Sequence, residues 1–178
     1  MRKLKNEELN RLSPEDFRKA DKTPVNIILD NVRSLNNIGS IFRTADAFRV
    51  EKIYLCGITA TPPHKDIHKT ALGATETVEW EYLKNTSDAV SALKTRGYTV
   101  VAVEQTVGSI SLRDFRIEPD KKYAFIFGHE IRGVDQKVVD ICDSCLDIPQ
   151  YGTKHSLNIA VSAGVVLWEV FRQFKWNK

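Results

Sequence analysis

The sequence predicts an α/β protein in which a mostly parallel β-sheet is sandwiched between helices. Short apolar runs of strand length recur along the chain, among them VNIILD at 25–30 and YAFIFG at 123–128. These runs are almost continuously apolar, as expected for strands that are buried on both faces. Segments with helical spacing of apolar residues separate them, which is the alternation typical of a parallel sheet covered by helices.

The length and composition indicate one globular domain. With 178 residues, 42% hydrophobic and 28% charged, the chain can bury a single sizeable core. We expect residues 25–178 to form this domain and residues 1–24 to form a basic extension with one short helix. The start, MRKLKNEELN, lacks the apolar core of a signal peptide, and the run IAVSAGVVLW is only half of the roughly 20 residues that a membrane span needs. We therefore expect a cytoplasmic protein without a membrane segment.

The first half of the chain predicts a helix in the extension, followed by alternating strands and helices. Ser13 is the predicted N-cap, with Pro14 at the first helical position and Asp16 three residues on, and this helix should end near Ala20. The strand at 25–30 leads to a helix with apolar residues at Ile38, Ile41, Phe42, Ala45 and Phe48. Next come a strand at 52–58, a polar loop at 59–69, a strand at 77–83 and a helix capped by Ser87 and ended by Gly97.

The second half predicts three more strands and a long final helix. The strands lie at 98–105, 123–128 and 145–149, with a short helix at 135–144. The final helix should run from Ser156 to about Trp176. Its apolar residues lie on more than one face: Ile159, Val161, Val165, Val166, Trp168, Val170, Phe171, Phe174 and Trp176. Something besides its own sheet must therefore cover it.

The cysteines argue against disulfide bonds and a metal site, whereas the net charge leaves a nucleic-acid partner open. Three cysteines without a secretion signal indicate reduced thiols. Cys142 and Cys145 form a lone C-x-x-C with no second pair and no nearby His, so we expect no metal site. The net charge of +3 permits a nucleic-acid partner without establishing one.

Polar residues follow four of the predicted strands, at the ends where ligands bind in open α/β sheets. The stretches are NNIGSIFR, VEQT, FGHEIRG and IPQYGTKHSLN. None of them contains the G-x-G-x-x-G of a dinucleotide site or the G-x-x-x-x-G-K-[ST] of a P-loop. A Rossmann dehydrogenase or a P-loop ATPase is therefore not expected.

Three stretches resemble, in order, the three motifs of the SpoU (TrmH-type) branch of the SPOUT RNA methyltransferases: NNIGSIFRTADAF, FIFGHEIRGV and IPQYGTKHSLNIAVSAGVVLWE. ALGA and VVAVEQT fit between them, so the resemblance covers roughly residues 25 to 175. It implies that the C-terminal part of the sheet is tied into a deep trefoil knot, a rare exception to unknotted chains. It also implies a homodimer in which the partner completes each active site, which would cover the final helix.

The activity implied by the resemblance is transfer of a methyl group from S-adenosylmethionine to a ribose 2′-hydroxyl of structured RNA, either tRNA or rRNA, without a metal. Motif matching nominates five catalytic residues: Asn37, Arg43, Glu130, Ser156 and Asn158. It places the cofactor at Thr106, Gly128, Ile148, Ser156 and Leu157. Two alternatives stay open, a catalytically silent RNA-binding protein on the same fold and an RNA base methyltransferase.

Several of these residues have more than one interpretation. Arg43 is either an unusual base, activated by a bound phosphate and a cationic neighbour, or a charged group that stabilises the developing alkoxide and the adjacent phosphate. Glu130 either orients Arg43 or the Asn158 amide, or is a plain surface acid. Ser156 is either an N-cap alone or also a ligand of the cofactor or a neighbouring loop. Arg49 and His129 depart from the family's usual residues, which puts substrate identity in question more than reaction type.

Overall fold

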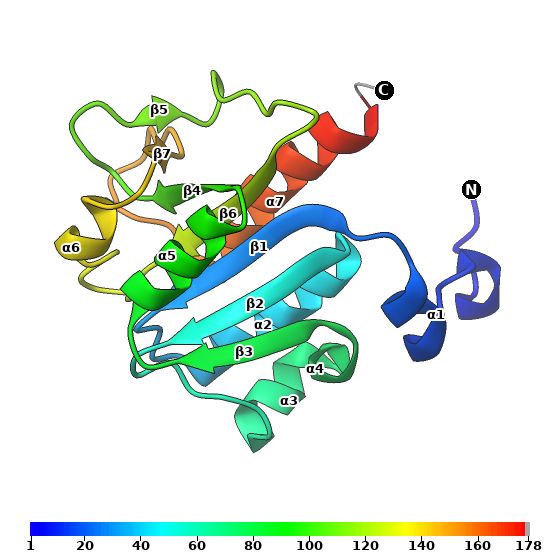
Figure 1. Ribbon diagram of the computed structural model, residues 1–178. Helices are drawn as coiled ribbons and strands as arrows, with labels where there is room; N and C mark the ends of the chain where they lie inside the picture. Colours follow the sequence, from blue (N-terminus) through cyan, green and yellow to red (C-terminus); the bar gives the residue numbers. More distant parts are fainter. Residues whose placement is uncertain (177–178) are drawn as a thin grey trace.

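Seven strands form one parallel sheet, and helices cover both of its faces in the computed structural model (Figure 1). The structure describes residues 1–176, with the backbone alone for Asn6, Lys175 and Trp176. The strand order is β3-β2-β1-β6-β4-β7-β5, and each neighbouring pair is parallel. The predicted α/β class with a mostly parallel sheet is therefore confirmed. The strands are β1 (Thr23–Asp30), β2 (Val50–Cys56), β3 (Glu79–Leu83), β4 (Tyr98–Val103), β5 (Ile110–Ser111), β6 (Lys122–Phe127) and β7 (Ser144–Asp147).

The helices divide between the two faces of the sheet. Buried residues of α2 (Leu35–Ala47), α3 (Lys65–Ala71), α4 (Ala74–Thr77) and α7 (Ile159–Trp176) belong to the core on one face. Those of α5 (Thr86–Thr95) and α6 (Gln136–Val139) belong to the core on the other. In the part of the chain that the structure describes, no helix is both long and apolar enough to cross a membrane.

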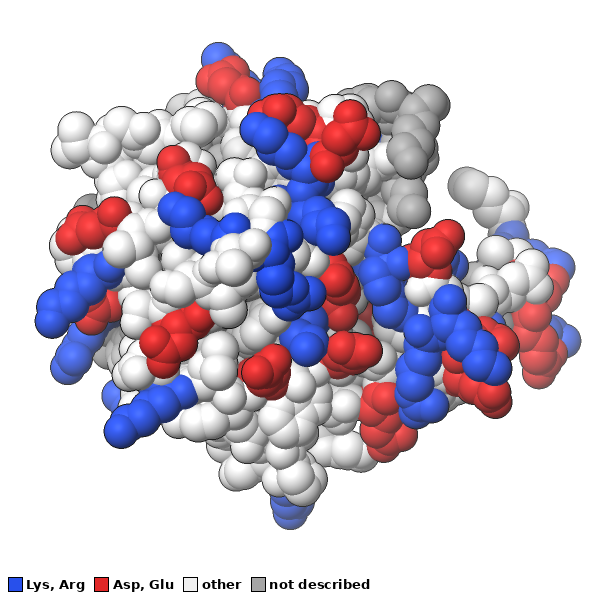
Figure 2. All heavy atoms as spheres, in the orientation of Figure 1, with Lys and Arg blue, Asp and Glu red and all other residues white. Residues whose placement is uncertain are grey.

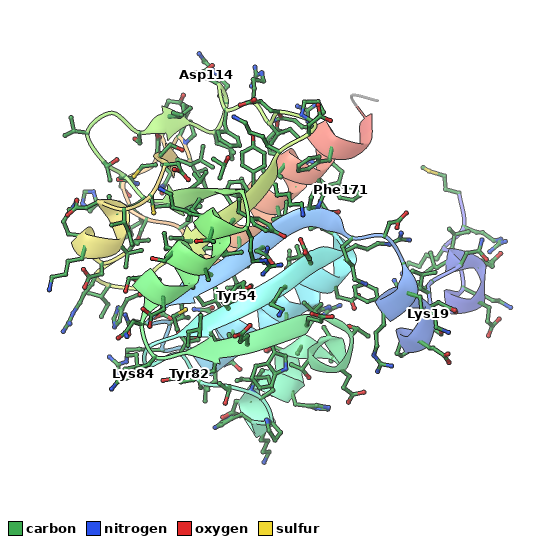
Figure 3. The ribbon with its side chains drawn as sticks, viewed as in Figure 1. Lys19, Tyr54, Tyr82, Lys84, Asp114 and Phe171 are labelled. Atoms are coloured by element: carbon green, nitrogen blue, oxygen red, sulfur yellow. The ribbon has the colours of Figure 1, made fainter. Side chains whose placement is uncertain are left out.

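The N-terminal extension lies beside the domain and contacts it through one helix. The 3-10 helix η1 (Asn6–Leu9) precedes α1 (Pro14–Lys19), and Figure 1 places both beyond the edge of the sheet. The Ser13 Oγ accepts the backbone N–H of Asp16 at 3.1 Å, as predicted for its N-cap. Phe17 is buried, whereas Lys19 lies on the outside of this helix (Figure 3).

Charged side chains of both signs are mixed on the face that carries α5. Figure 2 shows lysines and arginines interleaved with aspartates and glutamates there, without one continuous cationic patch. Ion pairs such as Lys52 with Glu81, at 3.4 Å, and Lys94 with Asp143, at 2.8 Å, are part of this mixture. This face therefore lacks the concentrated positive charge that a nucleic-acid footprint usually has.

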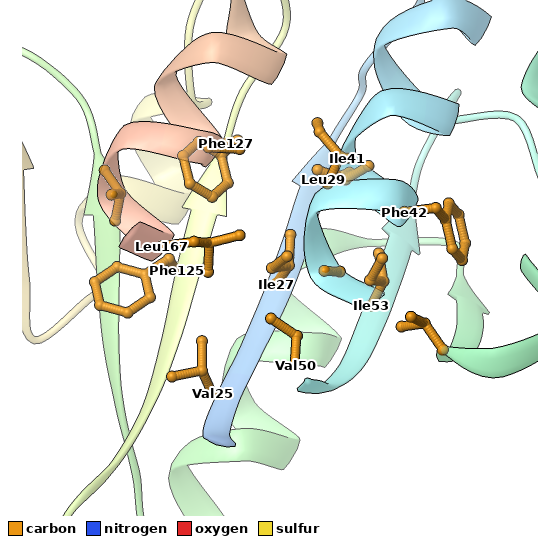
Figure 4. Packing of buried hydrophobic residues seen from close by; sticks show 14 of the residues in the cluster. Val25, Ile27, Leu29, Ile41, Phe42, Val50, Ile53, Phe125, Phe127 and Leu167 are labelled. Carbon is orange, nitrogen blue, oxygen red and sulfur yellow. The ribbon is translucent and has the colours of Figure 1, made fainter. Parts of the chain in front are cut away.

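Alternation along β1 explains why its sequence is apolar throughout. Ile27 and Leu29 pack into the core shared with α2 and α7, whereas Ile28 packs into the core shared with α5. All three are fully buried, and Figure 4 shows the first of these cores between β1, α2 and α7. Residues that point to either face of the sheet must therefore be apolar.

Several predicted boundaries are wrong: the strand predicted at 52–58 is β2 (Val50–Cys56), and the short helix predicted at 135–144 ends at Val139. The predicted loop at 59–69 contains the start of α3, whose only buried residues are Ile67 and Ala71, so its apolar spacing is too sparse to detect. Helix α5 begins at Thr86, before the predicted cap Ser87, and the Thr86 hydroxyl is held there by the Asp30 carboxylate.

The final helix begins later than predicted. Helix α7 starts at Ile159, and the side-chain oxygen of Asn158 accepts the N–H groups of Ala160 at 2.9 Å and Val161 at 3.4 Å. Asn158 therefore takes the capping role expected of Ser156, which lies exposed in the loop before the helix. The predicted apolar side chain of Trp176 lies outside the described side chains.

Candidate functional site

A cavity of about 530 Å³ lies beyond the carboxyl ends of β4, β6 and β7. Its walls come from residues 103–105 after β4, 127–133 after β6, the stretch 146–150 after β7, and the stretch 155–162 that leads into α7. Parallel strands bring their carboxyl ends to one edge of the sheet, which is why segments so far apart in sequence meet here. The cavity volume is typical of a small-molecule or cofactor site.

Glu130, in the loop after β6, is hydrogen-bonded to the first turn of α2. Its carboxylate accepts the backbone N–H groups of Ser34 at 2.9 Å and Arg33 at 3.1 Å, and the side-chain N–H of Asn37 at 3.3 Å. Burial alone would raise the pKa of Glu130. The hydrogen bonds from these groups and from its own backbone outweigh that effect and hold the pKa below its ordinary value. Glu130 is therefore a carboxylate at neutral pH, stabilised by the N-terminus of α2.

Asn37 joins Glu130 to the start of α7. While its amide nitrogen donates to Glu130, its amide oxygen accepts the side-chain N–H of Asn158 at 3.1 Å. The oxygen of Asn158 in turn caps α7. We call Glu130, Asn37 and Asn158 the amide chain. It connects the first turns of two helices and the loop after β6, so one nominated residue from each predicted motif takes part.

The turn after β6 contains two glycines, Gly128 and Gly133, that pack too closely against neighbouring atoms to carry a side chain. A Cβ at Gly128 would lie 2.2 Å from the carbonyl carbon of Gly133, and a Cβ at Gly133 would lie 2.0 Å from the Glu104 Oε2. Gly133 also has a φ of +68°, which favours glycine. Both positions therefore exclude a side chain, and they bring the turn against the end of β4.

Glu104 is a cavity residue that the sequence analysis did not nominate. Its carboxylate accepts the backbone N–H groups of Val134 and Gln105, each at 2.9 Å, and so ties the end of β4 to the turn after β6. The neighbouring Gln105 donates its side-chain N–H to the His155 carbonyl at 3.1 Å. The polar end VEQT of this strand was the available signal, but only its threonine was assigned a role.

The structure places four of the five nominated cofactor residues at the cavity. Gly128, Ile148, Ser156 and Leu157 line it, and Ser156 has no hydrogen-bond partner among the described residues. Thr106 is not among the lining residues. Its carbonyl accepts the backbone N–H of Ser109 at 3.2 Å, which closes a turn just beyond the cavity.

Arg43 is separated from the amide chain. It is exposed on α2, has no hydrogen-bond or ion-pair partner among the described residues, and does not line the cavity. It shares the outer face of α2 with Asn36, Ser40 and Ala47, which follow one another at helical spacing. The chain as described therefore does not bring its own Arg43 to the other four nominated catalytic residues.

Helix α7 and Leu157, two residues before it, present a row of exposed apolar side chains. Leu157, Val161, Val165 and Trp168 are 40%, 52%, 37% and 48% exposed and recur every three or four residues. We call these four residues the α7 row. Helices α2 and α7 pack together, and the Phe48 ring at the end of α2 lies 6.1 Å from that of Trp168. The prediction that the final helix is apolar beyond its core-facing side is confirmed.

Carboxylates and imidazoles occur around the cavity, but not in the grouping that a metal requires. Among the residues that the structure describes, no three or more His, Cys, Asp or Glu side chains converge to hold an ion. The two cysteines of the C-x-x-C lie outside the cavity, and burial raises the pKa of the Cys142 thiol to about 12.

Comparisons with known proteins found one matching family and several similar proteins. Residues 24–168 match the SpoU rRNA Methylase family. The 23S rRNA (guanosine-2′-O-)-methyltransferase RlmB of Nitrosomonas europaea is 32% identical over 151 residues, which are 83% of this chain and 55% of that protein. The chain spans little more than half the length of the curated relatives it matches, 58% for a TrmH-family relative from Staphylococcus aureus.

Solved structures of similar proteins also share the fold of this chain. The A. aeolicus TrmH/SpoU tRNA modifying enzyme has a TM-score of 0.80 at 29% identity, covering 92% of this chain and 81% of that one. The AdoMet-bound rRNA methyltransferase of Sinorhizobium meliloti has a TM-score of 0.78 at 30% identity, covering 91% of this chain and 61% of that one.

Proposed function

The chain belongs to the SpoU rRNA methylase family, and on this premise we propose that it is an S-adenosylmethionine-dependent methyltransferase acting on a ribose 2′-hydroxyl of tRNA or rRNA. The amide chain at the mouth of the 530 Å³ cavity carries this proposal. It joins one residue from each of the three motif stretches beside a space large enough for a cofactor. The names of the relatives, an rRNA guanosine-2′-O-methyltransferase and a tRNA modifying enzyme, support the same substrate class.

The residues of the cavity fit S-adenosylmethionine. Ile148 and Leu157 offer apolar contact for an adenine ring, while the carboxylates of Glu104 and Asp147 suit ribose hydroxyls or an ammonium group. Gly128 lets the Gly133 backbone pack against the end of β6, and this close packing shapes one wall of the cavity. When bound, the cofactor supplies an electrophilic methyl group on a positively charged sulfur.

The nominated residues divide between positioning and charge stabilisation. The amide chain fixes the start of α7 and thereby the preceding Ser156 and Leu157. Arg43 remains charged and stabilises the negative charge that develops on the ribose oxygen and the charge of the adjacent phosphate. This role suits an exposed guanidinium with no partner among the described residues, and it requires no deprotonation.

We propose that a second copy of the chain brings Arg43 to the cavity. The α7 row is exposed, and α7 packs against α2, the helix that carries Arg43. A symmetric pair that buries the row would place the outer face of α2 in the interface, where a partner's Arg43 lies near the start of the other α7. The homodimer thus accounts for both the exposed apolar side chains of the α7 row and the separation of Arg43 from its own cavity.

Three further features belong to the same proposal. The C-terminal part of the sheet forms a deep trefoil knot, as the resemblance of the three motif stretches to SPOUT methyltransferases implies. Residues 1–24 are an RNA-binding extension of the domain formed by residues 25–178, as their seven lysines and arginines suggest. The protein works in the cytoplasm, where tRNA and rRNA are available.

Transfer of labelled methyl groups tests the proposed function. The protein is incubated with methyl-labelled S-adenosylmethionine and, in parallel, with unmodified total tRNA and rRNA, while calorimetry measures cofactor binding. We expect label in one RNA pool and a saturable cofactor site. Cofactor and RNA binding without incorporation would instead identify a catalytically silent RNA-binding protein.

A further inference from the structure

A second cavity, of about 500 Å³, lies beside β3, the strand at one end of the strand order. Pro62 and Pro63 come from the loop before α3, His64 and His68 from α3 and its cap, and Trp80 from β3. The cavity shares no lining residue with the first one. Trp80 is half-buried and packs against the core on the α2 side, which leaves part of its ring to the cavity.

We propose that this second cavity binds one nucleotide of the RNA substrate, away from the ribose that is methylated. The inference rests on the proposed function, because it names a further contact of the same RNA. An indole ring and two proline rings form an apolar surface suited to the face of a base, and RNA-binding proteins hold unpaired bases by stacking on aromatic side chains. A volume of about 500 Å³ accommodates a base with its ribose.

Polar groups around this cavity complement a nucleotide rather than a purely apolar ligand. Lys65 and His68 lie at its rim and can contact a phosphate. Thr75 and Glu76 line the same cavity and can pair with the polar edge of a base, the carboxylate accepting from an amino group. The Glu76 carboxylate disfavours a small free anion, so a base with an attached phosphate fits the lining better than phosphate alone.

The N-terminal extension brings a further cation to this cavity. The Arg18 guanidinium on α1 donates to the backbone carbonyl of Glu76 at 3.3 Å. Helix α1 therefore contacts α4, which forms one wall of the cavity. RNA seated in the cavity would meet the basic extension directly, so the two can act as one RNA-contacting region.

The cavity also lies on the side of the sheet that carries Arg43. Helix α3, which supplies His68, packs closely against α2, since the Thr70 hydroxyl donates to the Asn36 carbonyl at 3.1 Å. In the proposed dimer, a structured RNA at the cavity that receives Arg43 can therefore extend to the second cavity of the chain that supplies Arg43. The α5 face, with its mixed charges, is on the other side of the sheet (Figure 2).

Nuclear magnetic resonance with AMP, CMP, GMP and UMP tests whether the cavity takes a base. The indole N–H signal of Trp80, assigned with a Trp80→Phe variant, should shift with at least one nucleotide at millimolar concentration. Shifts confined to residues of the first cavity, or no shift at any concentration up to about 10 mM, would overturn the proposal. The measurement needs neither cofactor nor methyl transfer, so its result is independent of the proposed activity.

Variants then separate an RNA site from a site for free nucleotides. His68→Ala removes a rim group and Thr75→Trp fills the cavity, and each should weaken binding of total tRNA or rRNA about tenfold, the effect of losing one stacked base. Lys84→Ala is the matched control, because Lys84 is an exposed cation past the other end of β3 (Figure 3). Unchanged RNA affinity in both variants, with unfolding temperatures like that of the parent, would overturn the proposal even if mononucleotides bind.

Discussion

Asn37 is the residue on which the geometry of the first cavity depends most. One amide contacts both the Glu130 carboxylate and the Asn158 amide, so it connects the loop after β6 with the start of α7. Its neighbour Asn36 is exposed on the same helix turn, and its side chain has no hydrogen-bond partner among the described residues. The two asparagines therefore form a matched pair for mutation.

Replacing Asn37 with Ala should lower the methyl-transfer rate at least tenfold and the free energy of unfolding by about 1 kcal/mol, because two side-chain hydrogen bonds are lost. Asn36→Ala should change the stability by less than about 0.5 kcal/mol and should lower transfer far less than Asn37→Ala, because Asn36 lies on the outer face of α2 and takes no part in the amide chain. Urea unfolding and single-turnover transfer measure the two effects. Equal effects of the two substitutions would mean that the amide chain supports neither methyl transfer nor stability.

Arg43 should act on the transition state rather than on cofactor binding. Arg43→Ala should reduce transfer by about 100-fold or more while the cofactor dissociation constant stays within about twofold, since its charge acts on the ribose oxygen and the adjacent phosphate rather than on the cofactor. Arg43→Lys keeps the charge and should recover part of the rate. Calorimetry with S-adenosylmethionine, alongside labelled transfer, separates the two quantities. Turnover like that of the parent would exclude Arg43 from the mechanism.

At the scale of elements, α2 and α3 pack closely at Gly39. A Cβ at Gly39 would lie 2.1 Å from the Thr70 Oγ1 and 2.3 Å from the Ile67 carbonyl oxygen. Gly152, in the loop before α7, has no atom within 4 Å of the corresponding position and no positive φ. An added methyl group would therefore meet closely packed atoms at Gly39 and open space at Gly152.

Gly39→Ala should destabilise the fold by about 2 kcal/mol, because the backbone of α3 must move to admit the methyl group. Gly152→Ala should leave the stability unchanged or raise it by up to about 1 kcal/mol, through the smaller entropy of the unfolded chain. Urea denaturation of both variants checks the comparison. A Gly39→Ala protein as stable as the parent would mean that α2 and α3 lie further apart than described.

The α7 row gives an element-scale prediction about assembly. Val161→Glu places a charge in the middle of the row, so it should convert a dimer into a monomer without unfolding the chain, because Val161 is 52% exposed. Ser91→Glu adds the same charge on the exposed side of α5 and should leave the dimer intact. Light scattering after size-exclusion chromatography reports the mass. A parent protein that is already monomeric would contradict the proposed homodimer.

Element types were more predictable than their ends. Continuous apolar runs correctly predicted β1, β4 and β6, and Ser13 correctly predicted the start of α1. The start of α7 was misjudged because Ser156 and Asn158 are both good capping residues by local preference. Asn158 takes the role in a setting that also includes Asn37, which is 121 positions away, so local sequence could not decide between them.

At the scale of the whole molecule, the order of the strands and the meeting of distant residues lay beyond local patterns. Strand β4 lies between β6 and β7 although it precedes both in the chain, and Glu104 contacts Val134 only because of that order. Motif order did nominate Asn37, Glu130 and Asn158 together. It could not indicate that Arg43 lies outside the cavity of its own chain, since a motif records proximity in sequence and not the face of a helix.

The position of the transferred methyl group tests the central claim most directly. RNA labelled with methyl groups by this protein is hydrolysed in alkali, which cleaves next to a free 2′-hydroxyl and spares a 2′-methylated linkage. We predict that the label is recovered in alkali-resistant dinucleotides, as expected for a ribose mark. Label recovered in mononucleotides that carry a methylated base would contradict ribose methylation and identify a base methyltransferase on the same fold.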